Sequence, residues 1–304
     1  MIEVEHLTRR YGEVLAVDDV GFSIAAGEVV GLLGHNGAGK TTIMKMLTGF
    51  LEPTAGTIRV DGLSLDRDRA AIQARLGYLP ENCPVWPEMS VIDYLEYQAA
   101  LHGVPAARRA AAVARAIRRT ELADKATSPI HTLSRGYRQR VGVAQAILHE
   151  PSIVILDEPT NGLDPTQILH MRELIRDLAR TATVIVSTHI LQEVQAVCER
   201  VLILRSGRLA LDARLADLQA DRGLAVETIQ DARAVLADVV GAEAVEVCAG
   251  PPGRHRYRLQ VDPERAPEVA RALHRAGIEL CELAPERRDL ETVFARVNEE
   301  VAHG

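Results

Sequence analysis

Hydrophobic and polar positions divide the first part of the chain, up to about residue 220, into strand-like and helix-like segments. In the strand-like runs near the N-terminus, apolar and polar residues alternate, and each run ends at a glycine. After a glycine-rich turn, residues 41–51 carry apolar side chains at helical spacing. Buried strands separated by helices predict a parallel sheet covered on both faces. The strand-like segments are residues 2–12, 14–34, 152–159, 181–190 and 201–212, the last a predicted hairpin with a Ser-Gly turn.

A helical region follows the first strands. Residues 90–125 are rich in alanine, and a further helix is expected to begin near Ser134, which predicts an inserted helical subdomain at about 82–150. Before it, residues 77–89 contain three prolines and the only tryptophan, Trp86. We expect a loop at 77–89, because proline neither continues a helix nor donates to a strand ladder. Trp86 either serves a function there or packs over a core edge.

The pattern changes after about residue 220. Residues 221–304 are expected to form a C-terminal accessory domain in the order strand, helix, strand, strand, helix, strand. That order predicts a small α+β, ferredoxin-like arrangement with a turn at 251–253 between its middle strands. A last helix is expected at 290–302. The cysteines and histidines of this region lack metal-ligand spacing, so no metal site is expected there.

Composition and charge narrow the class of protein. The 304-residue chain has a formal net charge of −7, which argues against a general nucleic-acid binder. Its four cysteines lie far apart without a CxxC pair, so neither a zinc site nor a disulfide framework is expected, and a reducing cytosol fits best. The N-terminus has no apolar signal core, and no apolar run approaches the roughly 20 residues that cross a bilayer. We expect no membrane crossing by this chain.

The segment GHNGAGKTT, residues 34–42, matches a phosphate-binding pattern and lies between a predicted strand and helix. Its glycines allow successive backbone N–H groups to face phosphate oxygens, and the helix N-terminus adds its dipole. Lys40 is expected to reach the β and γ phosphates of a nucleotide, and Thr41 to hold Mg²⁺. The predicted nucleotide-binding residues of this loop are Asn36, Gly37, Ala38, Gly39, Lys40, Thr41 and Thr42.

Two consecutive acids end the apolar segment 153–156. Asp157 suits a direct or second-sphere contact with Mg²⁺ in a phosphoryl-transfer site. Glu158 is the candidate general base, because a carboxylate beside a metal-bound triphosphate can polarise water for in-line attack. The alternative is that these acids cap the next helix. His189 ends the following strand and is expected to contact the γ phosphate, although a lone strand-end histidine is more often structural.

Together these motifs resemble the nucleotide-binding subunit of an ATP-binding cassette (ABC) transporter, over residues 1 to about 220. LSRGYRQR, residues 133–140, resembles the family signature, whose serine and second glycine correspond to Ser134 and Gly136. The resemblance implies an α/β P-loop cassette with a mostly parallel sheet, an antiparallel β subdomain and the helical insert. It also implies a head-to-tail homodimer, in which each signature helix faces the γ phosphate of ATP held by the other chain.

Three further residues take expected roles from the same resemblance. Tyr11 resembles the aromatic residue that stacks on adenine, and the alternative is a strand-end surface tyrosine. NGLDP resembles the D-loop, which puts Asp164 at the dimer seam. His189 resembles the switch histidine. For the accessory domain we expect regulation or dimer support.

The sequence departs from the family pattern at two places. Arg135 and Tyr137 replace the first glycine and the glutamine of the usual LSGGQ signature. Glu81 replaces the Q-loop glutamine that normally touches Mg²⁺ and senses the membrane partner; its carboxylate could still ligate Mg²⁺. These variants resemble exporter cassettes of the branch that includes gliding-motility and copper-processing ABC proteins. On that resemblance, CPVWPEM docks a coupling helix of the membrane subunit, with Trp86 as the docking aromatic.

The expected function follows from the resemblance. The chain is expected to bind ATP and Mg²⁺, to hydrolyse ATP, and to power an ABC-2-type exporter from the cytoplasmic side of the membrane, as a peripheral homodimer beneath transmembrane permease subunits. No nucleic-acid partner is expected. The alternatives are a soluble ABC protein that remodels a ribosome or a DNA-repair complex, and a regulatory cassette that binds ATP without hydrolysis. Retention of Glu158, His189 and Ser134 argues against the regulatory alternative.

Overall fold

The computed structural model describes residues 1–220, 222–287 and 294. The chain divides into two compact units, Met1–Arg214 (unit 1) and Leu215–Gly304 (unit 2). Each unit has its own cluster of buried apolar side chains. Among the residues described, no helix combines the length and the apolar character needed to span a bilayer.

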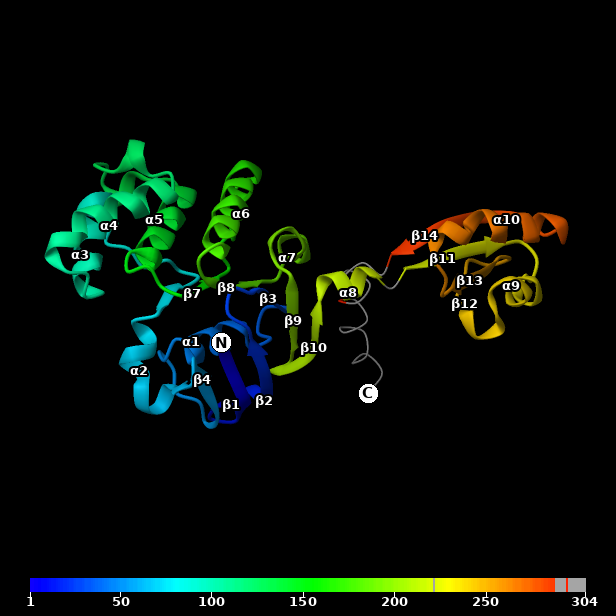
Figure 1. The fold of residues 1–304 in the computed structure, drawn as a ribbon, viewed down its shortest axis with the longest axis horizontal. Coiled ribbons are helices and arrows are strands. Elements are labelled where there is room, and N and C mark those ends of the chain that lie inside the picture. Colours follow the sequence, from blue (N-terminus) through cyan, green and yellow to red (C-terminus); the bar gives the residue numbers. More distant parts are fainter. Residues whose placement is uncertain (221, 288–293, 295–304) are drawn as a thin grey trace. The chain divides into compact units, whose positions relative to one another are not determined.

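Unit 1 is built around a six-stranded sheet with the order β10-β9-β3-β8-β7-β6 (Figure 1). All neighbouring strands pair in parallel except β9 and β10, so the predicted mostly parallel sheet is confirmed. The predicted hairpin is β9–β10, and its turn residues Ser206 and Gly207 both have positive φ, as tight hairpin turns require. The strands are β3 (Val29–Leu33), β6 (Leu76–Leu79), β7 (Ile153–Asp157), β8 (Thr183–Thr188), β9 (Arg200–Arg205) and β10 (Arg208–Arg214).

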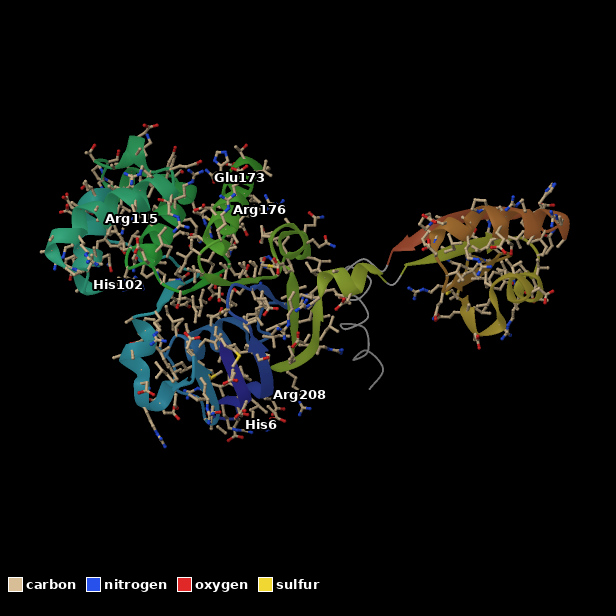
Figure 2. The ribbon with its side chains drawn as sticks, in the orientation of Figure 1. His6, His102, Arg115, Glu173, Arg176 and Arg208 are labelled. Atoms are coloured by element: carbon tan, nitrogen blue, oxygen red, sulfur yellow. The ribbon has the colours of Figure 1, made fainter. Side chains whose placement is uncertain are left out.

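A second, antiparallel sheet of unit 1 has the order β2-β1-β4-β5. Apolar side chains of this sheet, of the central sheet and of α1 (Lys40–Leu47) form one core. The sheets are also tied at the surface, where Arg208 of β10 pairs with Asp18 of β2 at 2.6 Å; Figure 2 labels Arg208 at this end of unit 1. The strands are β1 (Ile2–Tyr11), β2 (Val14–Ile24), β4 (Ala55–Val60) and β5 (Leu63–Ser64).

The predicted helical insert is confirmed. Three helices lie between β6 and β7 in the chain, although those two strands pair directly with each other. Figure 2 shows His102 and Arg115 on this layer of helices. Ser134 begins the third helix as expected, because its hydroxyl accepts a hydrogen bond from the Tyr137 N–H. The inserted α-helices are α3 (Val91–Leu101), α4 (Ala106–Arg119) and α5 (Arg135–Ile147). Besides α1, the other α-helices of unit 1 are α2 (Leu65–Gln73), α6 (Pro165–Ala179) and α7 (Leu191–Val197).

The prediction of a loop over 77–89 is wrong for its first three residues. Gly77, Tyr78 and Leu79 belong to β6 and pair in parallel with β7. The cause is tertiary: a strand of four residues is too short to be read from its own pattern, and pairing with a buried neighbour stabilises it. From Pro80 onward the segment is irregular, as predicted.

Gly77 allows helix α5 to approach β6 closely. A Cβ atom at this position would lie 2.2 Å from the backbone oxygen of Ala146. We expect Gly77→Ala to lower the free energy of unfolding by about 2 kcal/mol, because a backbone carbonyl cannot move aside without repacking the helix. Urea titration followed by circular dichroism measures this. Gly21→Ala is the control, since a Cβ there would meet Val4 O at an ordinary 3.5 Å; equal losses in both variants would contradict the packing explanation.

Unit 2 contains a four-stranded antiparallel sheet with the order β12-β13-β11-β14. The strands and helices follow one another in the predicted order, and the turn at 251–253 joins β12 to β13. The helix expected at 290–302 lies, apart from residue 294, outside the described residues. The elements are α8 (Leu215–Ala220), β11 (Arg222–Thr228), α9 (Arg233–Val240), β12 (Val245–Cys248), β13 (His255–Leu259), α10 (Ala266–Arg275) and β14 (Leu280–Arg287).

Candidate active site

The glycine-rich loop connects β3 to the N-terminus of α1. Gly37 and Gly39 have φ angles of +82° and +104°, in the left-handed region that glycine adopts at little cost. A Cβ at Gly39 would also lie 2.7 Å from the oxygen of Ala16. No side chain caps the N-terminus of α1, so backbone N–H groups of its first turn remain available to an anion.

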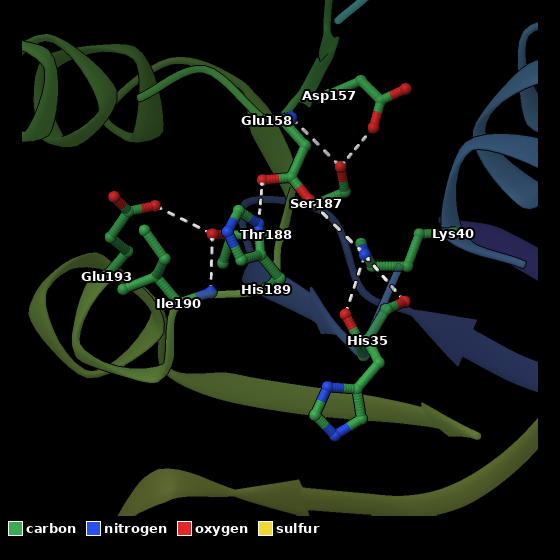
Figure 3. Close-up of polar contacts among 10 residues, drawn as sticks. His35, Lys40, Asp157, Glu158, Ser187, Thr188, His189, Ile190 and Glu193 are labelled. Carbon is green, nitrogen blue, oxygen red and sulfur yellow. Dashed lines mark hydrogen bonds and ion pairs between the residues drawn. The ribbon is translucent and has the colours of Figure 1, made fainter. Parts of the chain in front are cut away.

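Lys40 is the cation of this loop. Its side chain is 6% exposed, and its ammonium donates to the backbone oxygens of Gly34 at 2.7 Å and His35 at 3.3 Å. The same ammonium lies 3.4 Å from Oε1 of Glu158 (Figure 3). The lysine therefore joins the glycine loop to the end of β7 across the site.

Glu158 adopts a left-handed backbone conformation, with a φ of +48°. The residue is 5% exposed, and its carboxylate lies between two partners: Oε1 faces Lys40, and Oε2 lies 2.9 Å from Nδ1 of His189. Because a carboxylate accepts hydrogen bonds, Nδ1 carries the hydrogen, and Nε2 is the ring atom left to meet a ligand. The arrangement brings the predicted base and the predicted switch histidine into direct contact, as Figure 3 shows.

Asp157 lies behind Glu158 and is fully buried. Its Oδ1 accepts a hydrogen bond from the Ser187 hydroxyl, and its buried Oδ2 has no hydrogen-bond partner. Burial raises the pKa of the Asp157 carboxyl above its ordinary value, and the hydroxyls of Ser187 and Thr41 oppose that rise. The nearby charge of Glu81 raises the pKa further. Glu81 therefore adds negative charge near Asp157, which the Lys40 ammonium partly offsets.

Most of the sequence-predicted site residues line a single cavity of about 550 Å³. Ala38 is the exception within the loop, since its side chain packs in the apolar core. Sequence reasoning missed two lining residues, Ala16 and Asn161. A turn places Asn161, whose backbone N–H donates to the backbone oxygen of Glu158. The predicted residues that line the cavity are Asn36, Gly37, Gly39, Lys40, Thr41, Thr42, Glu81, Glu158 and His189.

The oxygen atoms of the site fit Mg²⁺ bound together with a nucleotide. Among the described residues, no group of three or more His, Cys, Asp or Glu side chains could hold a metal ion. Mg²⁺ does not need such a cage, because it keeps several waters and binds one or two carboxylates plus substrate phosphates. Thr41 and Glu81 line the cavity. The Asp157 carboxyl interacts with the Thr41 hydroxyl, and its buried Oδ2, which has no hydrogen-bond partner, is a third oxygen that could meet a metal ion.

The remaining predicted residues lie elsewhere. Gly136 and Asp164 line a different cavity, where Asp164 caps α6 by accepting from the Gln167 N–H at 2.9 Å. A Cβ at Gly136 would lie 2.5 Å from the Gln167 side chain, so this glycine lets α5 and α6 pack together. Tyr11 lines a third cavity, with the Arg9 guanidinium 4.6 Å from its ring centroid. The cavity around Lys40 is therefore formed without the signature residues.

A glycine-rich loop before a helix, with a buried aspartate, a glutamate and a histidine at the ends of neighbouring parallel strands, defines a P-loop ATPase. Similar proteins identify the family within this class. The ABC transporter family model matches residues 17–161. The Nod factor export ATP-binding protein I of Burkholderia orbicola is 33% identical over 299 residues, covering 97% of this chain and 96% of that protein. The ABC transporter ATP-binding protein NatA of Bacillus subtilis is 37% identical over 224 residues, covering 72% of this chain and 91% of NatA.

Solved structures of ABC transporter subunits have a similar fold. The ATP-binding subunit of an ABC transporter superposes with a TM-score of 0.66 and 31% identity, over 72% of this chain and 92% of that one. A dimeric bacterial ABC transporter cassette gives 0.65 and 25% identity, over 71% and 99%. The chain belongs to the ABC transporter family, as an ATP-binding subunit. It is an ATPase that uses ATP and Mg²⁺, and subunits of this family dimerise and pair with transmembrane permeases.

Proposed function

We propose that the chain hydrolyses ATP as a homodimer that powers an ABC-2-type exporter from the cytoplasmic face of the membrane. The observation that carries the proposal is the position of the Glu158 carboxylate, held between Lys40 and His189 at the edge of a cavity lined by the phosphate-binding loop. A regulatory cassette would not need this base beside the phosphate site.

The residues of the cavity, together with Asp157 behind Glu158, take the following roles. The first-turn N–H groups of α1 and Lys40 bind the phosphates, and Thr41 with Asp157 and Glu81 holds the metal ion. Glu158 accepts the proton of the attacking water. His189 donates through Nδ1 to Glu158 and meets the γ phosphate with the other side of its ring. Mg²⁺ supplies charge neutralisation on the phosphates when it is bound.

The proposed homodimer would complete this site. Ser134 and Gly136 lie at the N-terminus of α5, beside the N-terminus of α6 capped by Asp164, and line no part of the cavity around Lys40. A second copy arranged head to tail would bring the backbone N–H groups at the N-terminus of its α5 to the γ phosphate. In that dimer Tyr11 would stack on the adenine. The dimeric cassette among the structural relatives supports this arrangement.

Export rather than import is supported by the relatives and by the signature variants. The Nod factor export ATP-binding protein I of Burkholderia orbicola aligns with 97% of this chain. The LPE segment at 79–81 and the signature at 133–140 resemble the branch that includes gliding-motility and copper-processing ABC proteins. Unit 2 would be a ferredoxin-like accessory domain that supports regulation or the dimer, a proposal consistent with its strand order.

The proposed membrane partner would dock at the segment CPVWPEM. Trp86 is 54% exposed, and its ring lies 5.1 Å from that of Tyr97, measured between centroids. Cys83 and Pro84 of the same segment line a largely apolar cavity of about 1020 Å³ with exposed Phe50 and Leu101. An exposed aromatic beside an apolar groove is typical of an interface anchor.

Co-purification tests the proposed function. Wild-type protein from native membranes is expected to co-purify with a polytopic membrane protein that stimulates ATP hydrolysis. Trp86→Ala is expected to lose most of the co-purified protein and most of the stimulation. Val247→Ala, at a similarly exposed apolar residue of unit 2, is the control. A soluble partner would favour a soluble ABC protein instead, and no ATP turnover even with the membrane partner present would favour a regulatory one.

Glu81→Gln is expected to leave ATP affinity within about threefold of wild type but to change the partner-stimulated ATPase rate at least about twofold. Glu81 lines the cavity and its charge contributes to the raised pKa of Asp157, so its neutralisation alters the metal end of the site more than the phosphate loop. Nucleotide titration and ATPase assays with the co-purified membrane subunit measure the two effects. Unchanged stimulation would show that the acid has no special role.

A further inference from the structure

Ser187 connects the two acids of the site. It lies in β8 directly opposite Asp157 of β7 in the parallel register, and it is fully buried. Its hydroxyl donates to Oδ1 of Asp157, and it lies 3.1 Å from the backbone nitrogen of Glu158 (Figure 3). One hydroxyl group therefore contacts both residues at the end of β7.

The direction of the hydroxyl hydrogen follows from these contacts. The Glu158 N–H can only donate, so the Ser187 oxygen accepts from it. The single hydroxyl hydrogen is then directed at Asp157, where the carboxylate can only accept. This pins the carboxylate through Oδ1 and leaves the buried Oδ2 as the oxygen without a partner.

The same hydroxyl also constrains Glu158. The Glu158 N–H is shared between the backbone oxygen and the side-chain oxygen of Ser187, each at 3.1 Å. Glu158 has a φ of +48°, a conformation that a side-chain-bearing residue keeps only when its surroundings impose it. From this backbone position the carboxylate reaches both Lys40 and His189.

The other hydroxyl side chains of β8 point to different partners. Thr183 accepts from the N–H of Gly27 at 2.9 Å, and Thr188 donates to the carboxylate of Glu193 at 2.9 Å. Thr183 is almost fully buried, like Ser187, but touches neither acid. It therefore provides a matched position at which a buried hydroxyl can be removed from the same strand.

We propose that Ser187 is a positioning residue: it orients the Asp157 carboxylate toward the metal ion and fixes the backbone of Glu158 for water activation. The inference rests on the proposed roles of Asp157 and Glu158. Removing a hydrogen-bond partner of a metal-site carboxylate typically costs 10- to 100-fold in metal affinity or activity. Ser187→Ala is therefore expected to weaken Mn²⁺ binding to the protein–nucleotide complex about tenfold and to lower kcat similarly, while nucleotide affinity in EDTA stays within about twofold.

The experiment uses the full chain with a non-hydrolysable ATP analogue. Mn²⁺ is titrated and followed by electron paramagnetic resonance in wild type, Ser187→Ala, Ser187→Thr and Thr183→Val, and analogue affinity is measured separately in EDTA. Ser187→Thr, which keeps a hydroxyl, and Thr183→Val are both expected to bind Mn²⁺ within about threefold of wild type.

Two results would overturn the positioning role while the site itself stands: wild-type Mn²⁺ affinity in Ser187→Ala, or an equal loss in Thr183→Val or in Ser187→Thr. A wild-type chain whose nucleotide complex binds no Mn²⁺ would instead overturn the proposed metal site and the role of Ser187 together. The two kinds of failure are therefore distinguishable.

Discussion

Glu158→Gln is expected to reduce the turnover number for ATP hydrolysis about a thousandfold, within the range that a general base contributes. Glutamine keeps the shape of the side chain and can still accept from His189 Nδ1, but it cannot take a proton from the attacking water. The variant still binds ATP, because the phosphate-binding loop and Lys40 are unchanged. The variant is therefore expected to accumulate as an ATP-bound dimer, measured by phosphate release and by size-exclusion chromatography in excess Mg-ATP.

The control is Glu5→Gln, which neutralises an exposed acid of β1 that does not line the cavity. It should retain wild-type turnover and remain monomeric after ATP is consumed. A Glu158→Gln protein that stays monomeric in excess Mg-ATP would contradict the ATP-driven dimer. Turnover within tenfold of wild type would remove Glu158 from the role of base.

Lys40→Met is expected to weaken ATP binding at least about a hundredfold. Each charge-assisted hydrogen bond is worth about 1.5–3 kcal/mol, and about 1.4 kcal/mol changes an affinity tenfold. Methionine matches the apolar stem of lysine but offers no donor to phosphate. It also leaves the carboxylate of buried Glu158 without its cation at 3.4 Å. Equilibrium titration with a fluorescent ATP analogue measures the loss.

Lys45→Met is the matched control for this prediction. Lys45 lies on the same helix, is exposed, and lines the cavity that contains Tyr11 rather than the cavity around Lys40. Its replacement is expected to change ATP affinity less than about threefold. If Lys45→Met weakens binding as much as Lys40→Met does, the loss reflects the charge or stability of α1 and not contact with phosphate.

Much of the fold could be predicted because its signals are local. The buried strands β7 and β8 are continuous apolar runs, and α1, α3, α4 and α5 show helical spacing or alanine-rich composition. The elements β4, β5 and α2 were not predicted. Helix α2 is polar overall and kinked at Asp68, which has a φ of −114° and a ψ of 25°, so its pattern is weak.

The contacts between distant segments could not be predicted. Gly136 was assigned to phosphate contact from its place in the signature, but the structure adds a packing reason for glycine there, the Gln167 side chain of α6. Ser187 is a polar residue in an apolar strand, and this signal is visible in the sequence. Its partner, Asp157, cannot be predicted from the sequence, because the pairing depends on the register between β7 and β8.

The sequence by itself determined the phosphate-binding loop, the two acids and the histidine, because each is a short motif whose chemistry depends on neighbouring residues in the chain. Only the tertiary structure decided that Glu158 lies between Lys40 and His189, that Ser187 holds Asp157, and that Gly136 of the signature lines a separate cavity. Those contacts arise from strand register and helix packing across large sequence separations, where the local pattern carries no information about which side chains meet.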